Sequence, residues 1–82
     1  MPIPDLKELK AALSAAGSAH HEFEERYLNG VRDELWAGFY AAYVLGRFGD
    51  FASPTDLAKW LEATPVTNDW SADAAKLVLS RL

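Results

Sequence analysis

The residues whose types and spacing best suggest chemistry lie in the segment HHEFEE, from His20 to Glu25. Side chains four positions apart share one face of a helix, so His20 would lie beside Glu24 and His21 beside Glu25. An imidazole beside a carboxylate can perform general acid–base catalysis, and both groups also bind metal ions. One hypothesis is therefore a small metal-binding or acid–base site built from these four residues.

The same segment also has an ordinary structural explanation. Glu22 precedes Arg26 by four positions, which is the favourable order for an ion pair on a helix surface. His20 falls on an apolar helix face, where a neutral, hydrogen-bonded core histidine is the usual outcome. The HExxH motif and the ExxH unit of di-metal bundles are both absent from the sequence. We therefore expect no catalysis and no cofactor, and we assign no metal ligands.

Two further acidic residues, Asp33 and Glu34, follow later in the chain, and Trp36 lies about one helical turn after Asp33. Tryptophan often anchors a protein interface, where polar groups surround it. We therefore favour a small non-catalytic protein-interaction or regulatory module that binds a partner with a basic or mixed surface. We expect alanine at Glu24, Glu25 and Asp33 to weaken binding and leave the fold intact. The predicted partner-binding residues are His21, Glu24, Glu25, Asp33 and Trp36.

The overall charge disfavours two classes of partner. The chain contains eight Lys and Arg residues and twelve Asp and Glu residues, which gives a net charge of −4. Nucleic acids and anionic membranes are therefore not expected partners. In a helix-turn-helix interpretation, residues 54–63 would form the DNA-recognition helix. This segment carries two acidic residues, Asp56 and Glu62, and one basic residue, Lys59, which disfavours DNA binding. The first residues show no signal-peptide pattern, so we expect a cytoplasmic protein.

The first predicted helix spans most of the first 28 residues. Asp5 and Glu8 have the spacing of a capping box, and Asn29-Gly30 is a plausible stop. Gly17-Ser18 could bend or break this helix, but the apolar spacing stays in phase across it and favours one long helix. The same spacing resembles a short coiled coil, so a weak homodimer stands beside the monomer. The apolar positions are Leu6, Leu9, Leu13, Ala16, His20, Phe23 and Tyr27.

Residues 35–46 form a run of twelve without a single charge. The run is too short to span a membrane, so it predicts a helix over about 34–48, capped by Asp33 and buried on all sides. Gly38, Ala42 and Gly46 recur every four residues and predict the close approach of a neighbouring helix.

Two further helices complete the prediction. Ser53-Pro54 has the composition of a helix start, and Thr64-Pro65 that of a stop. Ser71 is expected to cap the last helix. The predicted inward-facing residues are Leu57, Trp60 and Leu61 in the third helix, and Ala74, Leu77, Val78 and Arg81 or Leu82 in the fourth. The sequence therefore predicts one all-α domain over 1–82, a compact four-helix bundle-like fold around the helix at 34–48, without cysteine or disulfide support.

Overall fold

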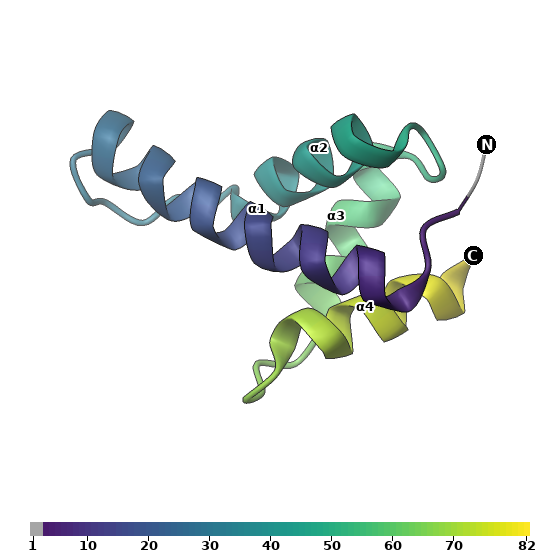
Figure 1. Cartoon of the computed structure of the whole chain (residues 1–82). Helices are drawn as coiled ribbons and strands as arrows, with labels where there is room; N and C mark the ends of the chain where they lie inside the picture. The colour runs from purple at the N-terminus through teal and green to yellow at the C-terminus, as the bar shows by residue number, and fades with distance from the viewer. Residues whose placement is uncertain (1–2) are drawn as a thin grey trace.

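The computed structural model describes residues 3–82, which form four helices joined by short loops and contain no strand (Figure 1). Helix α1 packs against α2 and α4, and α3 packs against the same two helices. The all-α prediction is therefore confirmed. The helices are α1 (Leu6–Tyr27), α2 (Trp36–Phe48), α3 (Pro54–Ala63) and α4 (Trp70–Arg81).

Two helix starts follow the local signals in the sequence. The Asp5 carboxylate accepts a hydrogen bond from the Glu8 backbone at 2.8 Å, and the Glu8 side chain accepts one from the Asp5 backbone at 3.1 Å. The Ser53 hydroxyl accepts from the Asp56 backbone at 3.1 Å, with Pro54 in the first helical position. These bonds satisfy amide groups that have no partner inside the helix.

The start of α4 differs from the prediction. Asp69, not Ser71, is the N-cap, and its side chain accepts a hydrogen bond from the Ala72 backbone at 3.4 Å. Asp69 also pairs with Lys10 of α1 at 3.2 Å, and this hydrogen bond lowers the pKa of the Asp69 carboxyl. Aspartate is the better choice here because its charge suits the helix N-terminus and a lysine side chain together.

The core lies where the four helices meet, and it encloses the N-terminal half of the apolar face of α1. Leu9 and Leu13 of this face are buried inside the same chain, so packing within the chain accounts for its apolar spacing. In α4 the prediction is partly right: Leu77 is only half-buried and Arg81 is exposed. The largest fully buried side chains are Leu9, Leu13, Val44, Leu57, Leu61 and Val78.

Helix α1 runs through Gly17 without a break, as the sequence favours. A Cβ atom at Gly17 would lie 3.1 Å from the hydroxyl oxygen of Tyr40. This glycine therefore leaves room for a tyrosine of α2, which explains its presence inside a helix.

Helix α2 is not buried on all sides, so that prediction is wrong. Gly38, Ala42 and Gly46 are exposed. Within residues 3–82, and apart from the adjacent backbone of α2 itself, no atom lies within 4 Å of the position that a Cβ would take at Gly38 or Gly46. The small-residue face therefore points to solvent and not to a neighbouring helix of the chain.

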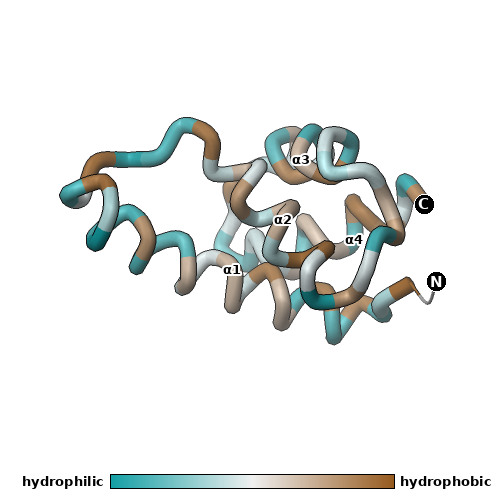
Figure 2. The backbone as a smooth tube through the Cα atoms, turned by 90° about the horizontal axis from the view of Figure 1, so that it is seen from above, coloured by the Kyte–Doolittle hydropathy of each residue, from teal (hydrophilic) through white to brown (hydrophobic). Residues whose placement is uncertain are grey.

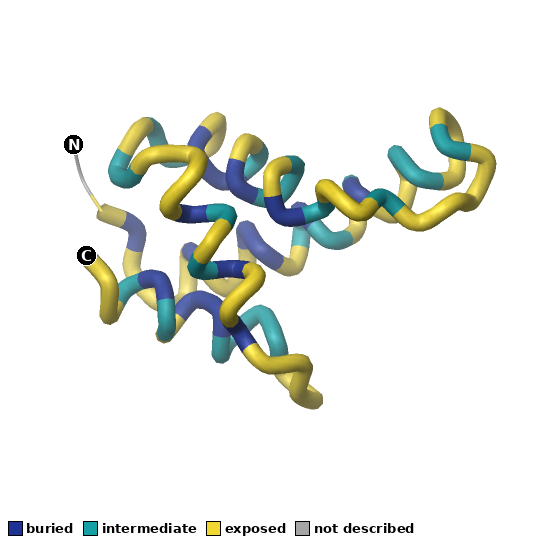
Figure 3. Tube along the Cα trace, turned by 180° about the vertical axis from the view of Figure 1, so that it is seen from behind, coloured by how far each residue is buried: buried dark blue, intermediate teal, exposed yellow. Residues whose placement is uncertain are grey.

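The two ends of the molecule differ in shape. With 22 residues against 13, α1 is about 33 Å long and α2 about 20 Å, so α1 extends past its neighbour. Its last two turns and the following loop project from the other helices in all three whole-chain views (Figures 1, 2 and 3). We call residues 21–34 the arm and the rest the body. No residue of the arm is buried. Within residues 3–82, no helix is both long and apolar enough to cross a bilayer.

Candidate functional site

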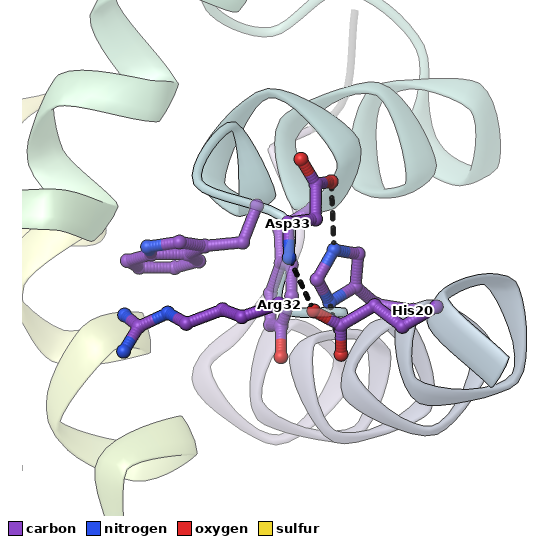
Figure 4. Close-up of a pocket in the computed structure, with 6 residues that line it drawn as sticks. His20, Arg32 and Asp33 are labelled. Atoms are coloured by element: carbon purple, nitrogen blue, oxygen red, sulfur yellow. Dashed lines mark hydrogen bonds and ion pairs between the residues drawn. The ribbon is translucent and has the colours of Figure 1, made fainter. Parts of the chain in front are cut away.

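Polar contacts among three side chains, His20, Glu24 and Asp33, join the arm to the body, and we call these three residues the clamp. His20 lies at the root of the arm and is only 5% exposed. Its Nε2 lies 2.9 Å from Asp33 Oδ2, and its Nδ1 lies 3.8 Å from Glu24 Oε1 (Figure 4). Both ring nitrogens of a buried imidazole therefore face carboxylates, one from the same helix and one from the loop.

The two carboxylates also bind the backbone of the loop. The Asp33 backbone N–H donates to Glu24 Oε2 at 2.6 Å. The Leu35 backbone N–H donates to Asp33 Oδ1 at 2.9 Å. The clamp thus connects the end of α1 to the first residue before α2 by contacts that do not depend on apolar burial.

Asp33 does not cap α2, contrary to the prediction. The helix begins at Trp36, its N-cap is Leu35, and no side chain caps it. The prediction fails because the Asp33 carboxylate binds His20 and the Leu35 amide instead. The helix therefore begins two residues later than predicted, and Glu34 lies before it.

Hydrogen bonding sets the charge state of Asp33. The bond from His20, followed by the bond from the Leu35 backbone, holds the pKa of the Asp33 carboxyl below its ordinary value of 3.8. Since Nε2 can bond a carboxylate only when it carries a hydrogen, Nε2 is the donor in the pair with Asp33. Burial, assisted by the negative charge of Glu24, raises the pKa of the nearby Tyr40 hydroxyl above 10.0.

Aromatic rings pack around His20. The centroids of Phe39 and Tyr40 in α2 lie 4.9 and 5.5 Å from the imidazole centroid, and Phe23 lies 6.3 Å away. A shallow hollow of about 320 Å³ opens beside the clamp. Figure 4 shows Arg32 extending away from His20 and Asp33. The residues that line the hollow are His20, Glu24, Arg32, Asp33, Trp36 and Tyr40.

This geometry suits a structural clamp better than a catalytic base. A general base needs a ring nitrogen with a free lone pair aimed at a substrate. Here Nε2 is bonded to Asp33, Nδ1 faces Glu24 at 3.8 Å, and His20 is only 5% exposed, so a substrate has little access to the ring.

The four residues of the acid–base hypothesis do not come together. The predicted pair of His20 and Glu24 forms, but His21 and Glu25 are both exposed, and no ion pair joins them in the described part of the chain. Among residues 3–82, no group of three or more His, Asp or Glu side chains is arranged to hold a metal ion. The predicted surface pair of Glu22 and Arg26 does form, at 3.0 Å.

Sequence reasoning missed the contact between His20 and Asp33. These residues are thirteen positions apart, so no helical or turn spacing relates them. The usable signal was indirect: a histidine on an apolar face needs a polar partner, and the next loop offers an aspartate.

The five predicted partner-binding residues separate into two groups. His21 and Glu25 are exposed on the arm. Glu24 and Asp33 have side chains only 19% and 17% exposed, and both are engaged in the clamp. Trp36 is half-buried and packs edge-on against Tyr40 and Trp70, with ring centroids 5.3 and 5.7 Å away. The expectation that alanine at Glu24 and Asp33 leaves the fold intact is therefore revised, because both residues position the arm.

Comparisons of this chain with protein families, with curated proteins and with solved structures give no match.

Proposed function

We propose that this chain is a small non-catalytic protein-interaction module and that the arm is its binding surface. The observation that carries the proposal is that the arm adds no buried residue to the core and yet is fixed in place by the clamp. A projecting segment of this kind contributes little to folding. Its fixed position instead favours binding, because a surface that is ordered beforehand loses less entropy when a partner arrives.

The surface chemistry of the arm indicates the kind of partner. Its five acidic and two basic residues give it a net charge of −3, whereas the whole chain carries −4. Two large side chains are exposed among these charges, Tyr27 at 76% and Val31 at 65%. Tyrosine is among the side chains that contribute most to protein interfaces, and negative charge steers basic partners towards the surface. The expected partner is therefore a protein with a basic or mixed surface.

Glu24 and Asp33 act through position in this proposal, whereas Glu25 and His21 lie where a partner can reach them. Trp36 lies at the edge of the arm, in the wall of the hollow beside the clamp. A side chain of the partner could reach Trp36 through that hollow.

The test is a quantitative affinity capture from an extract of the source organism, with the wild type and three single variants. Val31→Asp and Glu25→Lys change the exposed surface of the arm. Val66→Asp is the matched control, because Val66 is 94% exposed in the loop between α3 and α4. We expect a basic protein that the wild type and Val66→Asp retain and that the two arm variants lose. Identical profiles for all four proteins would contradict the proposal.

A further inference from the structure

Leu35, where the arm meets α2, is unusual in two ways: it is a large apolar residue exposed to solvent, and it occupies a helix N-cap. Its side chain is 80% exposed. It is also the N-cap of α2 and makes no capping hydrogen bond with its side chain. Leucine is among the poorest N-cap residues, whereas Ser, Thr, Asp and Asn are strongly preferred there. A residue that breaks local rules without gain inside its own chain is a candidate for a functional contact.

Gly38, one turn further along α2, is unusual as a glycine inside a helix. Glycine inside a helix is less stable than alanine, so it needs a reason. Gly17 has one, since Tyr40 occupies the space where its side chain would lie. Gly38 is exposed, and apart from the adjacent helix backbone no atom of residues 3–82 lies within 4 Å of its Cβ position. No neighbour in the described part of the chain therefore requires a glycine at this position.

Leu35 and Gly38 line the same hollow, which lies between α2 and α3 and has a volume of about 460 Å³. The hollow thus combines a projecting apolar side chain, an open space over Gly38, one cation and one anion. We call it the α2–α3 patch. Its lining residues are Leu35, Gly38, Pro54, Thr55, Ala58, Lys59 and Glu62.

We propose that a second copy of this chain binds to the α2–α3 patch and forms a two-fold symmetric dimer. In such a dimer the same surface lies on both sides, so the surface must complement itself. The patch meets this requirement in shape, because Leu35 of each copy can fill the space over Gly38 of the other. It also meets it in charge, because Lys59 of each copy can face Glu62 of the other.

The charge of the patch separates this dimer from the proposed binding surface on the arm. The patch contains one lysine and one glutamate, so it has no net preference for a basic or an acidic partner. The arm carries a net charge of −3, so contact between two arms would be repulsive. The dimer proposal is therefore independent of the proposed function.

Sedimentation equilibrium of the full chain, at concentrations up to about 1 mM, tests the proposal. The wild type should show a monomer–dimer equilibrium. Leu35→Asp and Gly38→Leu should each weaken dimerisation at least about tenfold, by removing the projecting group and by filling the space. Leu35→Asp also supplies a better N-cap, so loss of the dimer would not reflect loss of the fold. Gly46→Leu is the matched control, since Gly46 is equally open but lies outside the patch.

A charge exchange tests the symmetry of the interface. Lys59→Glu should weaken the dimer, and the double variant Lys59→Glu with Glu62→Lys should restore it, because the exchanged pair is again complementary. A double variant as weak as the single one would overturn the proposed pairing. A wild type that is monomeric throughout, or a dimer that survives both Leu35→Asp and Gly38→Leu, would overturn the proposal. Val31→Asp should dimerise like the wild type, which keeps this test apart from that of the arm.

Discussion

The body and the arm are held together by different forces, although the same helix α1 runs through both. In the body, α1 buries Leu9, Leu13 and Ala16 against the other helices. In the arm none of its residues is fully buried: Phe23 packs half-buried against Phe39 of α2, and the clamp of His20, Glu24 and Asp33 fixes the loop. The stability of the body is therefore spread over many apolar contacts, whereas the arm is held by the few polar contacts of the clamp and by the half-buried ring of Phe23. Such a segment can be altered or loosened without unfolding the whole chain.

The largest effect is expected in the body. Leu57→Ala removes a fully buried side chain and should lower the free energy of unfolding by about 2–5 kcal/mol. Urea denaturation followed by circular dichroism measures this loss. Val66→Ala, at the most exposed of the large apolar side chains, should change the midpoint very little. A small effect of Leu57→Ala would mean that apolar burial does not dominate the body.

A substitution in the arm should act locally. Gly30 has a φ angle of +78°, which L-amino acids with side chains adopt at a cost of about 1 kcal/mol. Gly30→Ala should therefore speed hydrogen exchange of the Val31 amide, which donates to the Leu28 carbonyl, by about fivefold. The urea midpoint should change little. A midpoint that falls in step with the exchange rate would show that arm and body unfold together.

The exposed face of α2 offers an effect of the opposite sign. Gly46 is exposed, and its Cβ position is free of neighbours. Gly46→Ala should therefore raise the free energy of unfolding by about 0.5 kcal/mol, since alanine restricts the unfolded chain and fits the helix. Gly17→Ala is the informative comparison, because its Cβ would lie 3.1 Å from the Tyr40 hydroxyl. Gly17→Ala should raise the free energy of unfolding less than Gly46→Ala does. Equal increases would contradict the close packing of Tyr40 against Gly17.

The smallest effect concerns pH. The pKa of Asp33 is lower in the folded protein than its ordinary value of 3.8, because His20 and the Leu35 backbone bond its charged form. This contribution to stability is present above the unfolded pKa and is lost as the pH falls through the folded one. The Leu35 amide resonance of the wild type should therefore shift below about pH 4. In Asp33→Asn this shift should be absent, and its persistence would assign it to another group.

The helix starts at Asp5 and Ser53 were predictable because each depends on residues within three positions. The exposure of one face of α2 was not predictable. An uncharged sequence indicates that a helix can be buried, but it does not indicate which side of the helix has a neighbour. The arm depends on the difference in length between α1 and α2, and so on where α2 begins. That point is set by the Asp33–His20 contact across thirteen positions, so one unpredictable pair moved both the helix start and the site.

The most direct test of the central claim is residue-resolved hydrogen exchange of the wild type and His20→Phe. Phenylalanine keeps an aromatic ring against Phe39 and Tyr40 but removes the bond to Asp33. We predict that the Leu35 and Asp33 amides exchange at least about tenfold faster in the variant, while the amides of Leu57 and Leu61 in α3 are nearly unchanged. Unchanged exchange at Leu35 and Asp33, or an equal acceleration throughout the chain, would contradict the claim that the clamp holds the arm.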